Sequence, residues 1–170
     1  MKFIKSILVL FLTLITSIGS AQLQFEAKPN HEDLKDKVFI ITELAKTDFS
    51  TSDSIVVKYK LYVSHDTGIE NWKETYLPEY IGFDANNLKS DNIKVVTETY
   101  NGETYRTVTF KEVILKPTQK GTLELPEYSL NVQASIPSKK DKKSYDDFGR
   151  PVLDKKDFTI KTDKISLTVK

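Results

Sequence analysis

The stretch from residue 92 to 134 constrains the fold most, because it holds three alternating apolar and polar runs separated by turn signals. The runs span residues 92–100, 103–116 and 122–134. Asn101-Gly102 separates the first two runs and suits a two-residue type I′ turn, since both positions need a positive φ. Residues 117–121 separate the second and third, with a fixed φ at Pro117 and a free one at Gly121. The stretch predicts an antiparallel meander with one buried face.

Further strands are predicted outside this meander. Residues 54–63 alternate most clearly, with Lys58 and Lys60 on one face of the strand and apolar side chains on the other. Those apolar side chains are Ile55, Val57, Tyr59, Leu61 and Val63. Shorter candidates are residues 23–27 (an edge strand), 38–44, 158–160 and 165–169. Residues 64–70 are expected to form a loop, and 77–83 an irregular segment, since Pro78 cannot donate to a ladder.

The apolar pattern changes parity twice within the meander. Val108 and Phe110 share one parity, whereas Val113 and Leu115 share the other. A second change separates the side chains before Pro126 from those after it; they are Leu123 and Leu125, then Tyr128, Leu130 and Val132. Because a one-residue slip turns side chains to the wrong face, β-bulges are expected near Lys111-Glu112 and Pro126-Glu127.

The whole pattern predicts an all-β chain, since no helical period of useful length follows residue 21. Seven to nine strands with polar turns are typical of an immunoglobulin-like antiparallel β-sandwich, with a small β-barrel as the alternative. The sandwich domain is expected at residues 38–170, preceded by a connector at 22–37. A charged surface excursion is expected at 138–157, where a lysine-rich run is followed by turn residues.

The first 21 residues are typical of a cleavable signal peptide. Lys2 and Lys5 precede an apolar run at 7–15, and Gly19-Ser20-Ala21 supplies small residues for cleavage. We expect cleavage after Ala21 and export to the periplasm or envelope. A retained membrane anchor is the alternative, and the apolar run is shorter than the roughly 20 residues that a spanning helix needs.

Charge and cysteine content exclude several classes of protein. The net charge of +1 becomes −1 without Lys2 and Lys5, which leaves no electrostatic footprint for nucleic acid or for an anionic membrane surface. The chain has no cysteine, and therefore no disulfide framework, thiolate nucleophile or cysteine-based metal site. Its two histidines are far apart, so no zinc site and no cofactor site are expected.

Three polar clusters have the residue types of reactive sites. Asp66-Thr67-Gly68 is the tripeptide of aspartic proteases, but Ser64-His65 precede it where a buried apolar strand should stand. Ser64, His65 and Asp66 match a triad only in type, because neighbours in an extended stretch point to opposite faces. The His31-Glu32-Asp33 cluster is interpreted as a solvated connector.

A fourth cluster has the oxygen spacing of a calcium loop. Its members are Asp48, Ser50, Ser52 and Asp53. The cluster lacks the central glycine and the terminal bidentate acid of such loops, so an ordinary turn is the preferred interpretation.

The aromatic residues Trp72, Tyr76, Tyr80 and Phe83 lie close together in a segment with proline and glycine. Exposed aromatic residues mark binding surfaces, so these four are the candidate partner-binding surface. The alternative is that they cap one end of the sandwich core.

Four segments resemble the second β-domain of the BatD family, the oxygen-tolerance (aerotolerance) proteins of Bacteroidetes-type bacteria. Residues 38–62 are similar to the start of that domain. Residues 77–83 resemble its LP-x-x-x-GF segment, residues 98–105 its ET-x-NG-x-x-Y hairpin, and residues 115–123 its L-x-P-x-K-x-G-x-L turn. The resemblance covers about residues 38–170. Family members are usually longer, with a further β-domain before this one and a membrane span after it. The chain is therefore expected to be a shortened relative or part of a longer protein.

The resemblance implies a non-enzymatic envelope scaffold, encoded beside von Willebrand type A-domain proteins and a MoxR-type ATPase, with no catalytic residues to transfer. Our first hypothesis is an exported β-sandwich that binds protein partners. A carbohydrate- or ligand-binding module with exposed, coplanar aromatic rings is the second, and a hydrolase built on Asp66 or His65 is the third.

Overall fold

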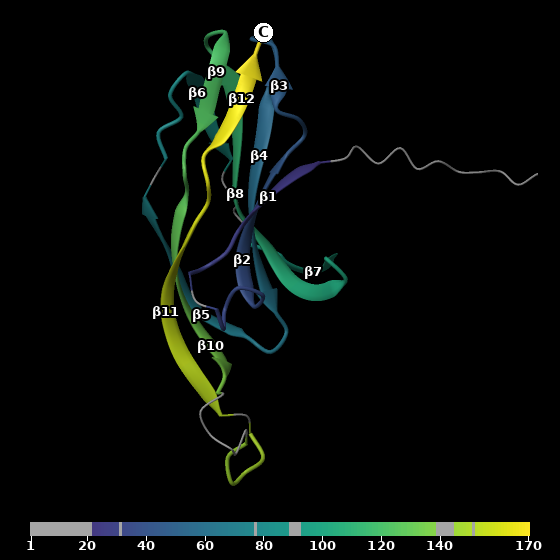
Figure 1. Cartoon of the computed structure of the whole chain (residues 1–170), viewed down its shortest axis with the longest axis vertical. Helices are drawn as coiled ribbons and strands as arrows, with labels where there is room; N and C mark the ends of the chain where they lie inside the picture. Colours follow the sequence, from purple (N-terminus) through teal and green to yellow (C-terminus); the bar gives the residue numbers. More distant parts are fainter. Residues whose placement is uncertain (1–21, 31, 77, 89–92, 139–144, 151) are drawn as a thin grey trace, which may run out of the picture.

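The computed structural model describes residues 22–30, 32–76, 78–88, 93–138, 145–150 and 152–170. Within these ranges the chain is all-β, with twelve strands and no helix (Figure 1). The strands are β1 (Leu23–Ala27), β2 (Val38–Leu44), β3 (Asp48–Phe49), β4 (Ile55–Ser64), β5 (Gly68–Tyr76), β6 (Phe83–Leu88), β7 (Val95–Tyr100), β8 (Glu103–Pro117), β9 (Gly121–Leu125), β10 (Ser129–Pro137), β11 (Leu153–Lys161) and β12 (Ile165–Val169). The expected leader and His31 lie outside the described residues.

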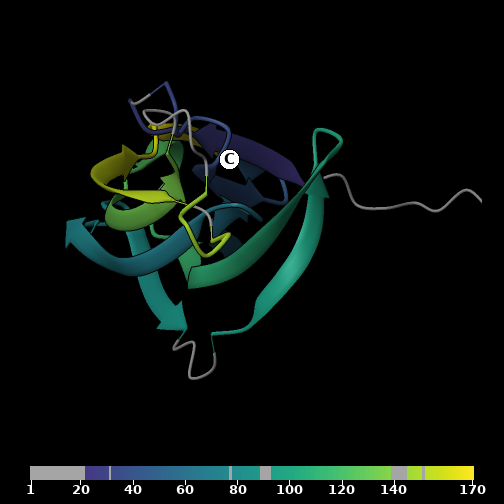
Figure 2. The same ribbon diagram turned by 90° about the horizontal axis from the view of Figure 1, so that it is seen from below.

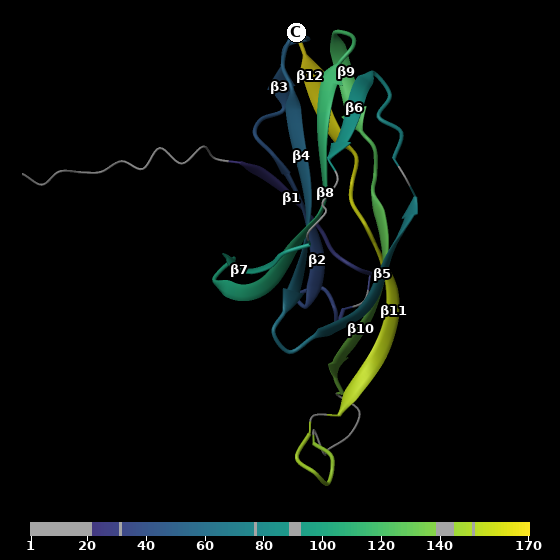
Figure 3. The same cartoon turned by 180° about the vertical axis from the view of Figure 1, so that it is seen from behind.

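The strands form one large sheet and two small ones. The large sheet has the order β1-β2-β4-β8-β6, and β7 pairs with the first half of β8. The small sheets are β11-β10-β5 and β3-β12-β9. All described pairings are antiparallel except β3 with β12. One buried apolar cluster combines side chains from all three sheets, an arrangement consistent with a β-sandwich (Figures 1 and 3).

Strand β4 confirms the clearest of the predicted strands. Its five alternating apolar side chains, from Ile55 to Val63, are all buried in this cluster, and Lys58 and Lys60 lie on the other face. The strand pairs with β2 on one side and β8 on the other. The predicted edge strand at 23–27 is β1, so part of the expected connector belongs to the large sheet.

The predicted meander is only half right. The first two runs form the β7–β8 hairpin, and Asn101 (φ 50°) and Gly102 (φ 85°) take the positive φ values that the turn signal requires. The third run does not pair with β8 but divides into β9 and β10, which belong to different sheets. Strand β7 also begins later than predicted, at Val95.

The second parity change marks the point where the chain passes from one small sheet to the other. One segment contains β9 and then β10, and the antiparallel segment contains β11 and then β12, so that β9 pairs with β12 and β10 pairs with β11. Both segments are interrupted at the same level, between β9 and β10 and between β11 and β12. There the Tyr128 N–H donates to Thr162 Oγ1 (2.8 Å), and the Thr162 N–H donates to the Tyr128 carbonyl (2.9 Å). The irregularity predicted at Pro126-Glu127 is therefore a break between strands, and it keeps Leu125 and Tyr128 both buried.

The first parity change is a bulge, as predicted. Tyr59 pairs with Lys111 and Lys60 pairs with Thr109, so Phe110 is the extra residue, one position before the predicted pair. Two other predictions are wrong in extent. The predicted loop at 64–70 is only a short turn before β5, and the strand predicted at 158–160 already begins at Leu153, within the expected excursion.

Residues 78–83 pack against the segment at 115–123. Gly82 has φ +84°, and the Thr118 N–H donates to its carbonyl (2.9 Å). A Cβ at Gly82 would lie 2.8 Å from Leu123 Cδ2 and 3.2 Å from Gln119 Nε2. Only glycine fits this contact, which joins the segment before β6 to the turn between β8 and β9.

Residues 98–105 cover part of the outer face of the large sheet. The Phe39 ring stacks on Tyr62 (5.1 Å between centroids) and meets the Tyr105 ring edge-on (5.0 Å). Glu98 of β7 accepts hydrogen bonds from Lys60 Nζ (2.9 Å) and the Tyr62 hydroxyl (2.7 Å). The motif residues Glu98 and Tyr105 thus hold the hairpin against β2 and β4.

Candidate functional site

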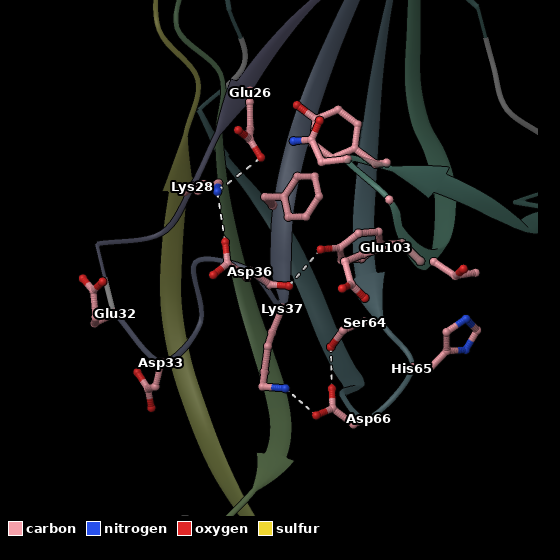
Figure 4. A pocket seen from close by; sticks show the side chains of 16 residues that line it. Glu26, Lys28, Glu32, Asp33, Asp36, Lys37, Ser64, His65, Asp66 and Glu103 are labelled. Atoms are coloured by element: carbon pink, nitrogen blue, oxygen red, sulfur yellow. Dashed lines mark hydrogen bonds and ion pairs between the residues drawn. The ribbon is translucent and has the colours of Figure 1, made fainter.

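A hollow at one end of the large sheet contains several of the candidate reactive residues (Figure 4). It has a volume of about 790 Å³ and is lined by the end of β1, the turn before β2, the β4–β5 turn and the tip of the β7–β8 hairpin. Six carboxylates and two lysines line it, namely Glu26, Glu32, Asp33, Asp36, Asp66, Glu103, Lys28 and Lys37.

Lysines neutralise most of these carboxylates. Lys28 Nζ lies 3.1 Å from Asp36 Oδ1 and 3.5 Å from Glu26 Oε1, and the hydrogen bond to Asp36 raises the pKa of Lys28. Glu32 pairs with Lys35 (2.7 Å), and Asp33 with Lys156 (3.7 Å). The Asp33–Lys156 pair ties the turn before β2 to β11, whereas Glu32 and Lys35 pair within that turn.

Asp66 is a weak base, because its neighbours stabilise the ionised form of its carboxyl group. It pairs with Lys37 Nζ and accepts a hydrogen bond from Ser64 Oγ (2.6 Å). Partial burial acts to raise the pKa of Asp66, but the hydrogen bonds from Lys37 and Ser64 outweigh burial and hold this pKa below its usual range. General-base catalysis at neutral pH requires the opposite shift.

The Ser64, His65 and Asp66 side chains do not form a relay. Ser64 donates directly to Asp66, and the exposed His65 ring points away from both (Figure 4). The arrangement links the end of β4 to the β4–β5 turn and to Lys37, and gives no activated nucleophile at Ser64.

The calcium-like cluster forms a turn stapled by its own polar groups. Asp53 Oδ2 accepts from the Ser50 N–H (3.0 Å) and from Lys46 Nζ (3.1 Å), and these bonds lower the pKa of Asp53. Ser50 Oγ lies 2.6 Å from Ser52 Oγ. Across the described part of the chain, no three histidine or acidic side chains are grouped as metal ligands.

The four candidate partner-binding aromatics do not form one exposed patch. Phe83 is buried, and Tyr80 is half-buried against the core, where burial raises its pKa. Trp72 is half-buried with its ring edge-on to Phe110 (5.3 Å), and Tyr76 at the end of β5 is 54% exposed. Like Tyr80, Trp72 packs against the core cluster, so Tyr76 is the one of the four that is mostly exposed.

Trp72 lines an apolar cleft that sequence reasoning missed. The cleft has a volume of about 290 Å³ and lies between β5 and the β4, β7 and β8 strands of the large sheet. Its walls are mostly aliphatic, formed by Leu61, Val63, Ile69, Trp72, Ile93, Val95, Arg106, Thr107 and Val108. No local signal identifies it, because its walls come from segments that meet only in the folded chain.

A second, polar hollow of about 310 Å³ lies on the β5-β10-β11 sheet. Strand pairing aligns Asn71, Gln133 and Asp157 in one row, and Lys73, Asn131 and Thr159 in the next. Gln133 Nε2 donates to Asp157 (3.0 Å), and Thr159 Oγ1 donates to Asn131 (2.6 Å). This surface offers amide, hydroxyl and carboxylate groups for hydrogen bonding.

Comparisons with known proteins add no family assignment. No family model matches the chain, and no curated protein and no solved structure matches it either. In the part of the chain that the structure describes, no helix has the length and apolarity to cross a membrane.

Proposed function

We propose that this chain is an exported, non-enzymatic protein-binding scaffold of the cell envelope, similar to the BatD family. Its fold would be an immunoglobulin-like β-sandwich behind a signal peptide that is cleaved after Ala21. Its partners would be envelope proteins, with von Willebrand type A-domain proteins as first candidates and an aerotolerance or stress-related complex as the setting. The observation that carries the proposal is the open apolar cleft beside Trp72.

An accessible apolar cleft supports a binding role because water-exposed aliphatic and aromatic surface gains free energy when a partner covers it. Tryptophan, the residue type of Trp72, is one of the three that are most enriched at binding hot spots. The BatD-like motif residues Glu98, Gly82 and Tyr105 hold strands together. This fits a family whose motifs preserve a scaffold.

An affinity pull-down from chemically crosslinked envelope of the host tests this proposal. The tagged chain should recover defined envelope proteins, and Trp72→Leu should lose them while remaining folded by circular dichroism. Phe148→Ser is the matched control, because Phe148 is 83% exposed in the excursion and lies outside the cleft. Equal recovery by all three proteins would contradict a partner surface at Trp72.

A carbohydrate- or ligand-binding module is the second candidate, and the polar hollow on β5, β10 and β11 favours it. Amide and carboxylate side chains in register can bind pairs of sugar hydroxyls. Co-sedimentation with purified envelope glycans tests this function. Binding that is lost in Asn131→Ala and retained in Val95→Asp, a change in the lining of the apolar cleft and not of the polar hollow, would favour the glycan-binding module over the scaffold.

A further inference from the structure

The large sheet extends beyond the strands that cover it. One row of side chains crosses its core-facing surface from β2 through β4 and β8 to β7, because Ile40 pairs with Leu61, Leu61 with Val108, and Val108 with Val95. Ile40 and Leu61 are buried, Val108 is half-buried, and Val95 is 62% exposed. The strands that pack on this face therefore cover the row at β2 and β4 but no longer cover it at β7.

The covering sheet ends at β5. Within the described residues β5 pairs only with β10, so its other edge carries backbone N–H and C=O groups without strand partners. Figure 2 shows β5 and the β7–β8 hairpin running in different directions, and no described strand pairing joins the two. A further strand beside β5 would satisfy this edge and cover Val95 together with Ile93, which is 57% exposed.

Charges at the cleft restrict what can occupy it. The carboxylates of β5 are already paired, Glu70 with Lys155 (2.8 Å) and Glu74 with Lys111 (3.8 Å). Among the described residues, Arg106 lines the cleft and bonds only the backbone carbonyls of Ser64 and Thr67, and Lys94 before β7 forms no ion pair. The uncompensated charge around the cleft is therefore positive, and a segment with carboxylates complements it.

We propose that the cleft between β5 and the β7–β8 hairpin accepts an extended segment of a partner protein that adds a strand to the edge of β5. The segment carries β-branched or other apolar residues at alternate positions, which face Val95, Trp72 and Ile69, and acidic residues that lie near Arg106 and Lys94. Main-chain hydrogen bonds give the affinity, and the apolar cleft selects the side chains. This inference rests on the proposed scaffold function and names the chemistry of its partner.

The test uses a short synthetic peptide in which valine and threonine alternate between glutamate ends. Trp72 is the only tryptophan in the chain, so its fluorescence reports directly on the cleft. Binding should shift this emission to the blue and protect the β5 amides from hydrogen exchange. A peptide with a central proline should not bind, because proline cannot continue the ladder, and lysine ends should weaken binding.

Exposed positions supply variants that leave the fold intact. Val95→Asp should weaken peptide binding about tenfold, because the bound peptide would bury the Val95 side chain and this apolar contact is lost in the variant. Leu153→Asp is the matched control, since Leu153 is 46% exposed on β11, which forms the opposite edge of the sheet that ends at β5. Unchanged affinity in Val95→Asp, equal binding of the proline peptide, or unprotected β5 amides would each overturn strand addition.

Two further outcomes separate this inference from the scaffold proposal. If Val95→Asp recovers the same envelope proteins as the wild type, strand addition is wrong and the scaffold stands; if the wild type recovers none, the scaffold is wrong whatever the peptide does. Self-association that Val95→Asp abolishes would assign the cleft to a second copy of this chain and overturn the acidic partner segment.

Discussion

Gly82→Ala should be among the most destabilising single-methyl changes available in this chain. Two costs add at this position. A side chain at φ +84° is strained by about 1–2 kcal/mol. A methyl group 2.8 Å from Leu123 Cδ2 also forces a buried leucine to move, and overpacking of this kind costs about 1–3 kcal/mol. The expected loss in the free energy of unfolding is therefore about 2–5 kcal/mol.

Gly102→Ala separates the two costs. Gly102 has nearly the same φ (+85°), but no atom lies within 4 Å of the position that its Cβ would occupy. It should lose only the strain component, about 1–2 kcal/mol. Urea unfolding followed by Trp72 fluorescence measures both variants on one scale.

A double-mutant cycle with Leu123→Ala tests the contact itself. Shortening Leu123 removes the clashing atoms, so Gly82→Ala should cost less in that background than in the wild type. Equal losses for Gly82→Ala and Gly102→Ala, or a cycle without coupling, would refute the argument that these two segments are held by a contact that only glycine permits.

Two further predictions concern a half-buried carboxylate and a buried backbone amide. Burial acts to raise the pKa of Glu98, but the hydrogen bonds from Tyr62 and Lys60 outweigh it and hold this pKa below its usual range. Because the folded-state pKa is depressed, the stabilisation is present above the unfolded-state pKa and is lost as pH falls through the folded-state value. Urea unfolding at several acidic pH values should show this slope, and a Glu98→Gln variant that keeps the wild-type slope would contradict it. Thr162→Val should cost about 1–3 kcal/mol, because the buried Tyr128 N–H then lacks an acceptor. Unfolding free energies compared with Thr159→Val, at an exposed position, measure this cost, and similar losses at both sites would argue against it.

Local sequence signals predicted local structure well. The Asn101-Gly102 turn and the alternation in β4 depend on neighbouring residues alone, and both are confirmed. Strand β6 was missed because Asp84, Asn86 and Asn87 are poor strand formers, and pairing with the second half of β8 overrides their preference.

Pairing between distant segments was beyond the reach of the sequence pattern. Residues 122–134 read as one run, and the parity change at Pro126 was interpreted as a bulge. The same change is equally compatible with a chain that leaves one sheet for another, and only the pairing of β9 with β12 and β10 with β11 decides between them. A period of two fixes which side chains share a face but not which strand lies alongside.

The same reasoning explains why the cleft beside Trp72 could not be found from the sequence. Trp72 and Phe83 are close in sequence, but one lies on an edge strand and the other is buried beside β8. The cleft depends on where the covering sheet ends, which makes Val95 accessible although it lies in the same row as the buried Leu61. An alternating run records that a face is apolar, and only the neighbouring layer determines whether that face becomes core or binding surface. Among the described residues no strand pairs with the second edge of β5, and the face that carries Val95 is therefore not part of the core.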